Sequence, residues 1–154
     1  MDWQPYVEAA PAASQADVGA LEARLGITLP ADYREALAAH GGQAPLNDRI
    51  RLGRGGTAFG PLLLAGPAEG ANRLYTIEFA LEQLREWTGA TDDRSLHLFP
   101  FATNTASGLF CFDFRADRAR PTIVFVSLDY EPDEENGIIP VANSFSELMG
   151  KLYR

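Results

Sequence analysis

The side chains with the greatest chemical reactivity are few and scattered along the chain. There are two histidines and one cysteine, whereas a structural zinc site usually needs four closely spaced ligands. Cys111 alternates with Phe110 and Phe112 on a predicted strand, where a thiol is usually buried and inert. His40 falls at the end of a predicted helix, where a cation is favourable, and His97 falls in a predicted strand. These residues predict no metal site and no nucleophile.

Isolated carboxylates also give no indication of catalysis. Asp92 and Asp93 precede a predicted strand and Asp113 lies within another, but none has an identifiable partner in the sequence. General acid–base catalysis depends on a positioned group with a tuned pKa, and no pair of residues is singled out for that role. We therefore expect a binding protein rather than an enzyme, with no catalytic residue and no cofactor.

Two loops superficially resemble ligand-binding motifs. The glycine-rich RLGRGGTAFG begins at Arg51, but no Lys-Ser/Thr follows it and Ala58 replaces the third glycine of GxGxxG. The acidic DYEPDEENG begins at Asp129, but a calcium loop would require glycine where Glu134 stands and glutamate where Pro140 stands. We expect the first to be a hairpin turn and the second not to bind calcium.

The distribution of charge is more informative. The net charge is −8, which argues against nucleic acid or an anionic membrane as the main partner. The segment from Pro121 to Gly150 has no Lys or Arg and contains six acids, five of them within residues 129–135. The candidate partner-binding residues are Asp129, Tyr130, Glu131, Asp133, Glu134 and Glu135. The alternative is that they form an ordinary solvated loop rich in turn formers.

Length and composition predict one globular domain. We expect a single domain over residues 1–154, of which 1–13 form a lead-in segment. The first residues lack the basic and apolar regions of a signal peptide, and no apolar run is long enough to span a membrane. The lone cysteine fits a reducing compartment, so a cytoplasmic location is expected. The oligomeric state cannot be predicted from these features.

Apolar spacing and capping residues predict the helices. They are expected between Ser14 and Gly26, from Pro30 to His40, from Thr76 to about Thr88, and after the capping box of Ser144 and Glu147. In the second helix, Pro30 suits the first turn, and Gly41 and Gly42 are expected to end it in left-handed conformations.

Apolar runs between polar turns predict the strands. The strongest are Leu96–Ala102, Gly108–Phe114 and Thr122–Asp129, followed by Ile138–Ala142, which together favour an antiparallel meander. Weaker strands are predicted at Ile50–Leu52 and Phe59–Leu64, with a turn at Arg54–Thr57. The prediction is an α+β fold: an antiparallel mixed sheet of about five or six strands with helices packed on it, two helices at the N-terminal end and one at the C-terminal end.

The segment LEARLGITLPADYREALAAHGG, residues 21–42, resembles the signature of the SUKH superfamily, which includes cell-wall-assembly regulators and bacterial toxin-immunity proteins. The second half of the chain is similar to the family as well, in an aromatic-Pro-Phe-Ala strand and a late Ser-Phe. The matching positions are Leu29, Pro30, Tyr33, Leu37, Gly41, Gly42, Phe99, Pro100, Phe101, Ala102, Gly108, Ile123–Val126, Ser144 and Phe145.

This resemblance implies an α+β fold in which the motif residues are mainly structural. It also implies that the chain is a protein-binding immunity domain that neutralises a cognate toxin, possibly a nuclease. A regulatory adaptor that binds an endogenous protein is the alternative. A third interpretation is a small enzyme or ligand-binding domain that uses a pocket beside Arg49–Arg54. Since fold alone does not identify a partner, the acidic segment is our hypothesis for the toxin-binding surface.

Overall fold

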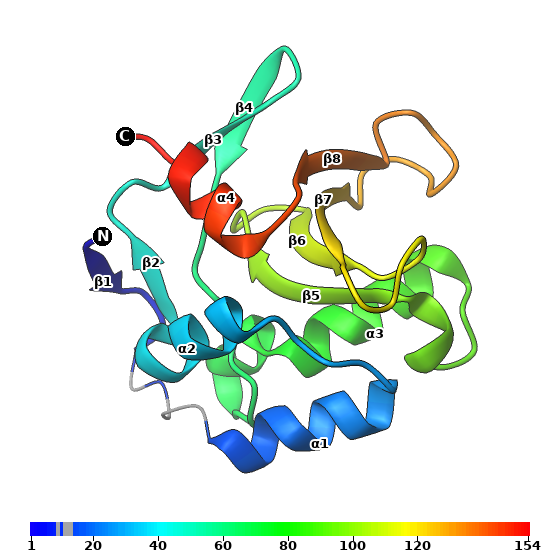
Figure 1. Cartoon of the computed structure of the whole chain (residues 1–154), viewed down its shortest axis with the longest axis horizontal. Coiled ribbons are helices and arrows are strands. Elements are labelled where there is room, and N and C mark those ends of the chain that lie inside the picture. The colour runs from blue at the N-terminus through cyan, green and yellow to red at the C-terminus, as the bar shows by residue number, and fades with distance from the viewer. Residues whose placement is uncertain (9, 11–13) are drawn as a thin grey trace.

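The computed structural model describes residues 1–8, 10 and 14–154, and it has the predicted α+β fold (Figure 1). The helices are α1 (Gln15–Leu25), α2 (Ala31–His40), α3 (Ile77–Thr88) and α4 (Phe145–Lys151), with 3-10 helices η1 (Gly70–Tyr75) and η2 (Arg94–Leu96). The strands are β1 (Trp3–Pro5), β2 (Gln43–Pro45), β3 (Arg49–Leu52), β4 (Gly55–Ala58), β5 (Leu98–Thr103), β6 (Gly108–Asp113), β7 (Thr122–Ser127) and β8 (Ile138–Ala142).

Local capping determines where the helices begin and end. The Ser14 hydroxyl accepts a hydrogen bond from the Asp17 amide at the start of α1, and Thr76 does the same for Phe79 at the start of α3. Gly26 ends α1 in a left-handed conformation, as glycine commonly does. The two predicted N-terminal helices and the C-terminal helix are therefore confirmed within a residue or two.

The end of α2 differs from the prediction in one respect. Gly41 has φ −54°, so only Gly42, with φ +80°, takes the left-handed conformation. The Gly42 carbonyl accepts hydrogen bonds from the amides of Tyr6 and Val7, and its amide donates to Leu62. An added Cβ at this position would lie 2.8 Å from the Ala10 Cβ, so glycine is required here both by backbone conformation and by close packing.

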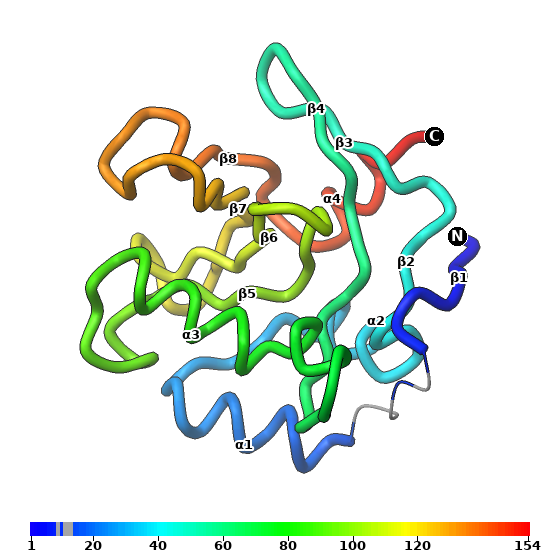
Figure 2. Tube along the Cα trace, turned by 180° about the vertical axis from the view of Figure 1, so that it is seen from behind, coloured from blue at the N-terminus to red at the C-terminus, as the bar shows by residue number. Residues whose placement is uncertain are grey.

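The four strands β5 to β8 form an antiparallel meander in sequence order, as predicted. The middle strands read as almost continuous apolar runs because both faces of this sheet are covered. Helix α3 lies behind the sheet in Figure 1 and in front of it in Figure 2, and it contacts β5. Helices α2 and α4 cover the opposite face (Figure 1).

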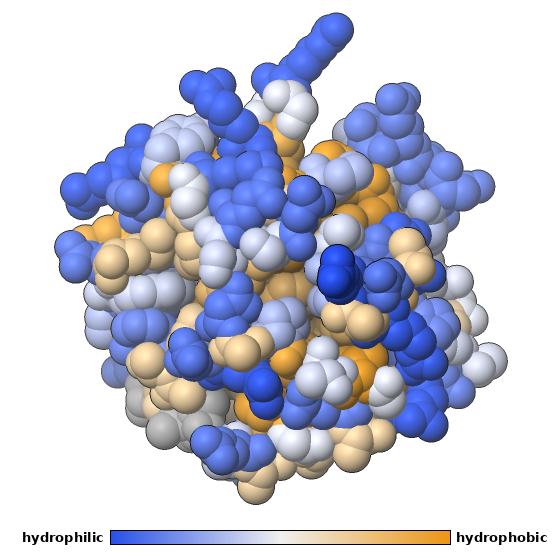
Figure 3. Space-filling view, viewed as in Figure 1, coloured by the Kyte–Doolittle hydropathy of each residue, from blue (hydrophilic) through white to orange (hydrophobic). Residues whose placement is uncertain are grey.

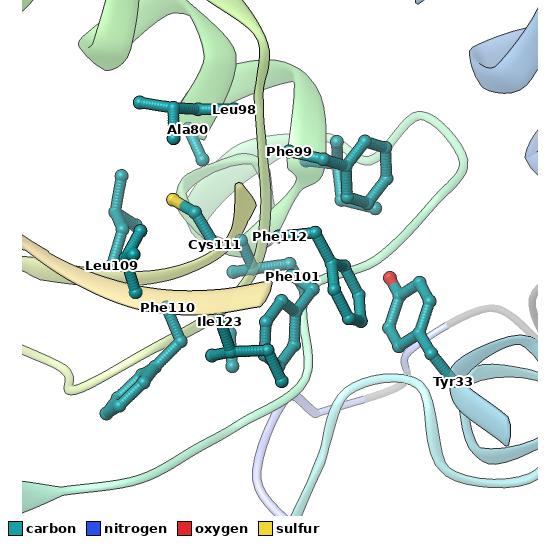
Figure 4. Packing of buried hydrophobic residues seen from close by; sticks show 14 of the residues in the cluster. Tyr33, Ala80, Leu98, Phe99, Phe101, Leu109, Phe110, Cys111, Phe112 and Ile123 are labelled. Carbon is teal, nitrogen blue, oxygen red and sulfur yellow. The ribbon is translucent and has the colours of Figure 1, made fainter. Parts of the chain in front are cut away.

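An aromatic cluster joins α2 and α4 to the sheet. The Tyr33 ring meets Phe99, Phe101, Phe112 and Phe145 edge-on, at centroid separations of 5.1 to 6.2 Å. Edge-to-face aromatic pairs of this kind add about 0.5–1.5 kcal/mol each beyond the burial of their area. Figure 4 shows the Tyr33 ring facing Phe112 and Phe101, with Cys111 and Leu109 directed toward Ala80 on the other side of the sheet.

The segment between β2 and β5 departs from the predicted strands. The turn of the β3–β4 hairpin is at Gly53–Arg54, and Gly55–Thr57, predicted as turn, belong to β4. The predicted strand Phe59–Leu64 forms only isolated bridges, Leu62 with Ala102 and Leu64 with Thr76. Pro61 has no amide hydrogen to donate, and Gly60 has φ +104°, so this buried segment lies beside β5 without forming a regular ladder.

The strands are divided among three sheets rather than one. In addition to the meander, β3 pairs with β4 and β1 pairs with β2. Strand β1 lies in the segment predicted as a lead-in, and the Trp3 ring stacks on His40 at 4.5 Å between centroids. Residues 9 and 11–13 of that predicted segment lie outside the described residues.

The aromatic cluster generates a stability prediction. Tyr33 is fully buried, and among the described residues its hydroxyl has no hydrogen-bond partner; burial also raises the pKa of this hydroxyl. An unpaired buried polar group is destabilising, so Tyr33→Phe should increase the free energy of unfolding by about 1 kcal/mol. Tyr33→Ala should reduce it by about 3–5 kcal/mol. Denaturant unfolding measures both changes, and a Tyr33→Phe variant that is clearly destabilised would show that the hydroxyl has a partner.

The buried thiol generates a second prediction. Burial, with a smaller effect from Asp113, raises the pKa of Cys111 far above its ordinary value. The thiol of the unfolded chain has a pKa of about 8.5. Below that pH the thiol is neutral in both states and the folded protein keeps its full stability. Above it, ionisation of the unfolded chain lowers the free energy of unfolding. At pH 8, a disulfide reagent should modify one thiol per chain in the denatured protein and none in the folded protein. Rapid stoichiometric modification of the folded chain would contradict this assignment.

Candidate interaction surface

The acidic segment forms a loop between β7 and β8, and backbone hydrogen bonds organise it. Its ends are joined by the bond from the Ser127 amide to the Gly137 carbonyl, 2.9 Å. Within it, the Glu134 amide donates to Glu131 and the Gly137 amide donates to Glu134, each at 3.0 Å. The acids are therefore carried on consecutive tight turns rather than on an irregular segment.

Two distant elements hold this loop in place. The indole Nε1 of Trp87, on α3, donates to the Tyr130 carbonyl at 2.6 Å. The Ser107 hydroxyl, in the β5–β6 turn, donates to the Asp129 carboxylate, and the Ser107 carbonyl accepts from the Leu128 amide at 2.9 Å. These contacts fix one end of the loop against the body of the molecule.

The predicted partner-binding side chains all lie at the surface. Asp129, Glu131, Asp133, Glu134 and Glu135 are exposed, and 42% of Tyr130 is exposed. Glu134 accepts a hydrogen bond from the Glu131 amide. In the described part of the chain, the carboxylates of Glu131, Asp133 and Glu135 have neither an ion-pair partner nor a hydrogen-bond donor. They are available to charges on another molecule.

A shallow depression lies beside this loop and was not predicted from the sequence. Its volume is about 300 Å³, and its lining includes Leu74, Tyr75, Phe79 and Leu128. Leu74 is 56% exposed, which is unusual for a large apolar side chain flanked by structured segments. No sequence pattern indicates this depression, because η1 has no clear helical periodicity.

The motif residues of the resemblance lie where the fold requires them. Leu29, Tyr33, Leu37, Phe101 and Phe145 are buried in the core. Pro30 and Ser144 are the N-cap residues of α2 and α4, and Gly108 begins β6. Pro100 lies in β5, just before a shift in its pairing register with β6.

The chemically reactive residues are dispersed. His40 is the last residue of α2 and its Nδ1 lies 2.9 Å from the Gln43 side chain. The prediction that His97 lies in a strand is wrong, because it caps η2 with φ +55°. The His97 side chain is exposed.

Across residues 1–8, 10 and 14–154, no cluster of three or more His, Cys, Asp or Glu side chains could hold a metal ion.

Within the part of the chain that the structure describes, the β3–β4 hairpin and the edge of the meander show no sign of a binding site. Arg49, Arg51 and Arg54 are exposed on the β3–β4 hairpin, where Arg51 lies over the Tyr153 ring. The edge strand β8 is a poor template for a further strand, because Pro140 lacks an amide hydrogen and the Lys151 ammonium donates to the Val141 carbonyl at 2.8 Å. No helix among the described residues has the length and apolar character needed to cross a membrane.

These features define an α+β domain whose most distinctive surface is a fixed acidic loop next to partly exposed apolar side chains. A family model described as the SMI1 / KNR4 family (SUKH-1) matches residues 12–151. The chain therefore belongs to this family, which is known for toxin immunity and related roles and is generally non-catalytic. A search of curated proteins finds no match to the chain.

The turn geometry of the acidic loop generates a prediction. Gly137 is buried, and a Cβ at this position would overlap the Glu131 carbonyl oxygen. Gly137→Ala should therefore displace the loop and reduce the free energy of unfolding by about 1–3 kcal/mol. The matched control is Gly55→Ala on β4, where an added Cβ meets no atom within 4 Å. Amide hydrogen exchange should increase in the loop of the first variant alone, and equal protection in both would contradict the geometry.

Proposed function

We propose that the chain is a non-enzymatic immunity protein that binds and neutralises a cognate bacterial toxin through the acidic β7–β8 loop. Membership of the SMI1 / KNR4 family supports the general role. The observation that carries the proposal is the set of exposed, unpaired carboxylates of Glu131, Asp133 and Glu135 on a loop held by Trp87 and Ser107.

Charge complementarity provides the physical rationale. A nuclease toxin presents a basic cleft to its substrate, and a fixed acidic surface can occupy that cleft. Complementary charges accelerate encounter and disfavour wrong partners. Because the backbone of the loop is already ordered by its hydrogen bonds, association costs less conformational entropy than it would for a flexible segment.

Apolar side chains near the loop would supply the rest of the affinity. Tyr130 is a suitable anchor, since partly exposed aromatic residues often dominate binding energy at interfaces. Leu74 and Tyr75 border the depression beside Leu128 and could receive an apolar side chain of the partner. The acidic side chains would then determine the rate and specificity of association. Tyr130, Leu74 and Tyr75 would determine how long the complex lasts.

A regulatory adaptor is the second candidate function, because the family also has regulator members. It would use the same surface to bind an endogenous protein, and no toxin would be neutralised. A growth assay separates the two functions. The toxin-like domain of the protein that binds this chain is expressed in cells with or without the chain. Immunity predicts that growth is restored by the chain, whereas unrestored growth would contradict it.

The acidic loop generates a kinetic prediction. Replacing Glu131, Asp133 and Glu135 by lysine should slow association with the partner at least about tenfold at low salt, and much less at high salt. The measurement is the association rate constant by surface plasmon resonance in both buffers.

The control for this prediction reverses three exposed acids in other segments, Asp2, Glu35 and Asp117. It changes the net charge by the same amount, so it separates local contact from overall attraction. Equal slowing in the two variants, or unchanged binding by the loop variant, would contradict the assignment of this loop.

A further inference from the structure

A second surface, formed by three segments far apart in the chain, has the opposite charge. A groove of about 670 Å³ lies between the α1–α2 connection, the β6–β7 connection and the start of α4. The charged residues in its lining are Arg34, Arg118 and Arg120, and no acidic residue lines it. In a chain with 21 acidic and 13 basic residues, a groove with this lining has a distinct local potential.

These arginines are available to a ligand. All three are exposed. In the described residues, none of them forms an ion pair, although five other basic residues do. Arg118 donates one hydrogen bond, from Nη2 to the Gly26 carbonyl at 2.8 Å. That contact positions its guanidinium at the groove and leaves further N–H donors unused.

The groove also has an accessible apolar lining. Ala31 and Ala119, which are exposed, and Pro30 and Pro121, which are half-buried, contribute to it alongside the arginines. Two further depressions share lining residues with it. One, of about 350 Å³ between α1 and α2, is also lined by Glu35, and the other, of about 380 Å³ beside Gly26, is also lined by Glu22. Arg34 lines all three. The face that carries these segments shows apolar surface between hydrophilic side chains (Figure 3).

We propose that this groove binds an extended acidic peptide segment of a partner protein, at a site separate from the acidic β7–β8 loop. Arginine guanidinium groups bind carboxylates with paired, charge-assisted hydrogen bonds. Alternate apolar side chains of the segment would contact Pro30, Ala31 and Pro121. The chain thus presents two surfaces of opposite charge, which would discriminate among partners more strictly than one.

A peptide suits the groove better than the other anionic occupants. A long nucleic acid would be repelled by the net charge of −8, and it would not use the apolar lining. The acidic loop of a second copy forms tight turns closed by the bonds from Glu134 to Glu131 and from Gly137 to Glu134. A loop closed in this way is not an extended chain, so it would not lie along the groove between the α1–α2 connection, the β6–β7 connection and the start of α4.

The test uses a fluorescently labelled synthetic peptide with alternating glutamate and leucine residues, titrated by fluorescence anisotropy. The groove variant carries Arg34, Arg118 and Arg120 replaced by glutamate. The matched control carries the same replacements at the exposed residues Arg49, Arg51 and Arg54 of the β3–β4 hairpin, and therefore has the same net charge. Circular dichroism establishes that both variants are folded.

The proposal predicts that the groove variant binds the peptide at least about tenfold more weakly than the control, since charge-assisted hydrogen bonds are the stronger class. In the wild-type chain, amide chemical shifts of Thr28, Ala31 and Asn143, which line the groove, should change on titration. Equal weakening in both variants, or no binding by the wild-type chain, would overturn the proposal. Tighter binding of a single-stranded oligonucleotide, or concentration-dependent self-association in sedimentation, would also overturn it.

Discussion

The packing of Tyr33 against four phenylalanine rings is the contact on which the arrangement of helices and sheet depends. It brings α2, two strands of the meander and α4 together at one buried point. The LP motif before α2 and the glycines after it make this possible, because they fix where the helix begins and ends. The unpaired hydroxyl of Tyr33 is a local energetic cost that the surrounding aromatic packing offsets.

This core positions both charged surfaces. The basic groove is built around the connection that leads into α2 and the start of α4, so its lining residues Pro30 and Ser144 directly adjoin the buried Leu29 and Phe145. The acidic loop lies beyond the ends of β7 and β8, and α3 holds it through Trp87. The acidic loop therefore depends on the sheet and on α3, and the basic groove depends on the connection into α2 and on the start of α4.

Features with local causes could be predicted from the sequence. The caps Ser14, Gly26 and Thr76 act within one helical turn, and the meander follows from apolar runs separated by polar turns. The pairing of β1 with β2 and the irregular path of Phe59–Leu64 depend on distant partners and on Gly60–Pro61, which no periodicity reveals. At the candidate site, composition predicted an exposed acidic loop. Its anchor Trp87 lies 43 residues from Tyr130, so the fixing of the loop could be seen only in the folded chain.

Affinity capture of the tagged protein from its native cells, at low and high salt, tests most directly whether this domain acts by binding a cognate toxin. Our interpretation predicts one stoichiometric protein partner with a toxin-like C-terminal domain, and less of it recovered at high salt because exposed charges are screened. Recovery of an abundant housekeeping protein in its place, or of no stoichiometric partner in either buffer, would contradict it.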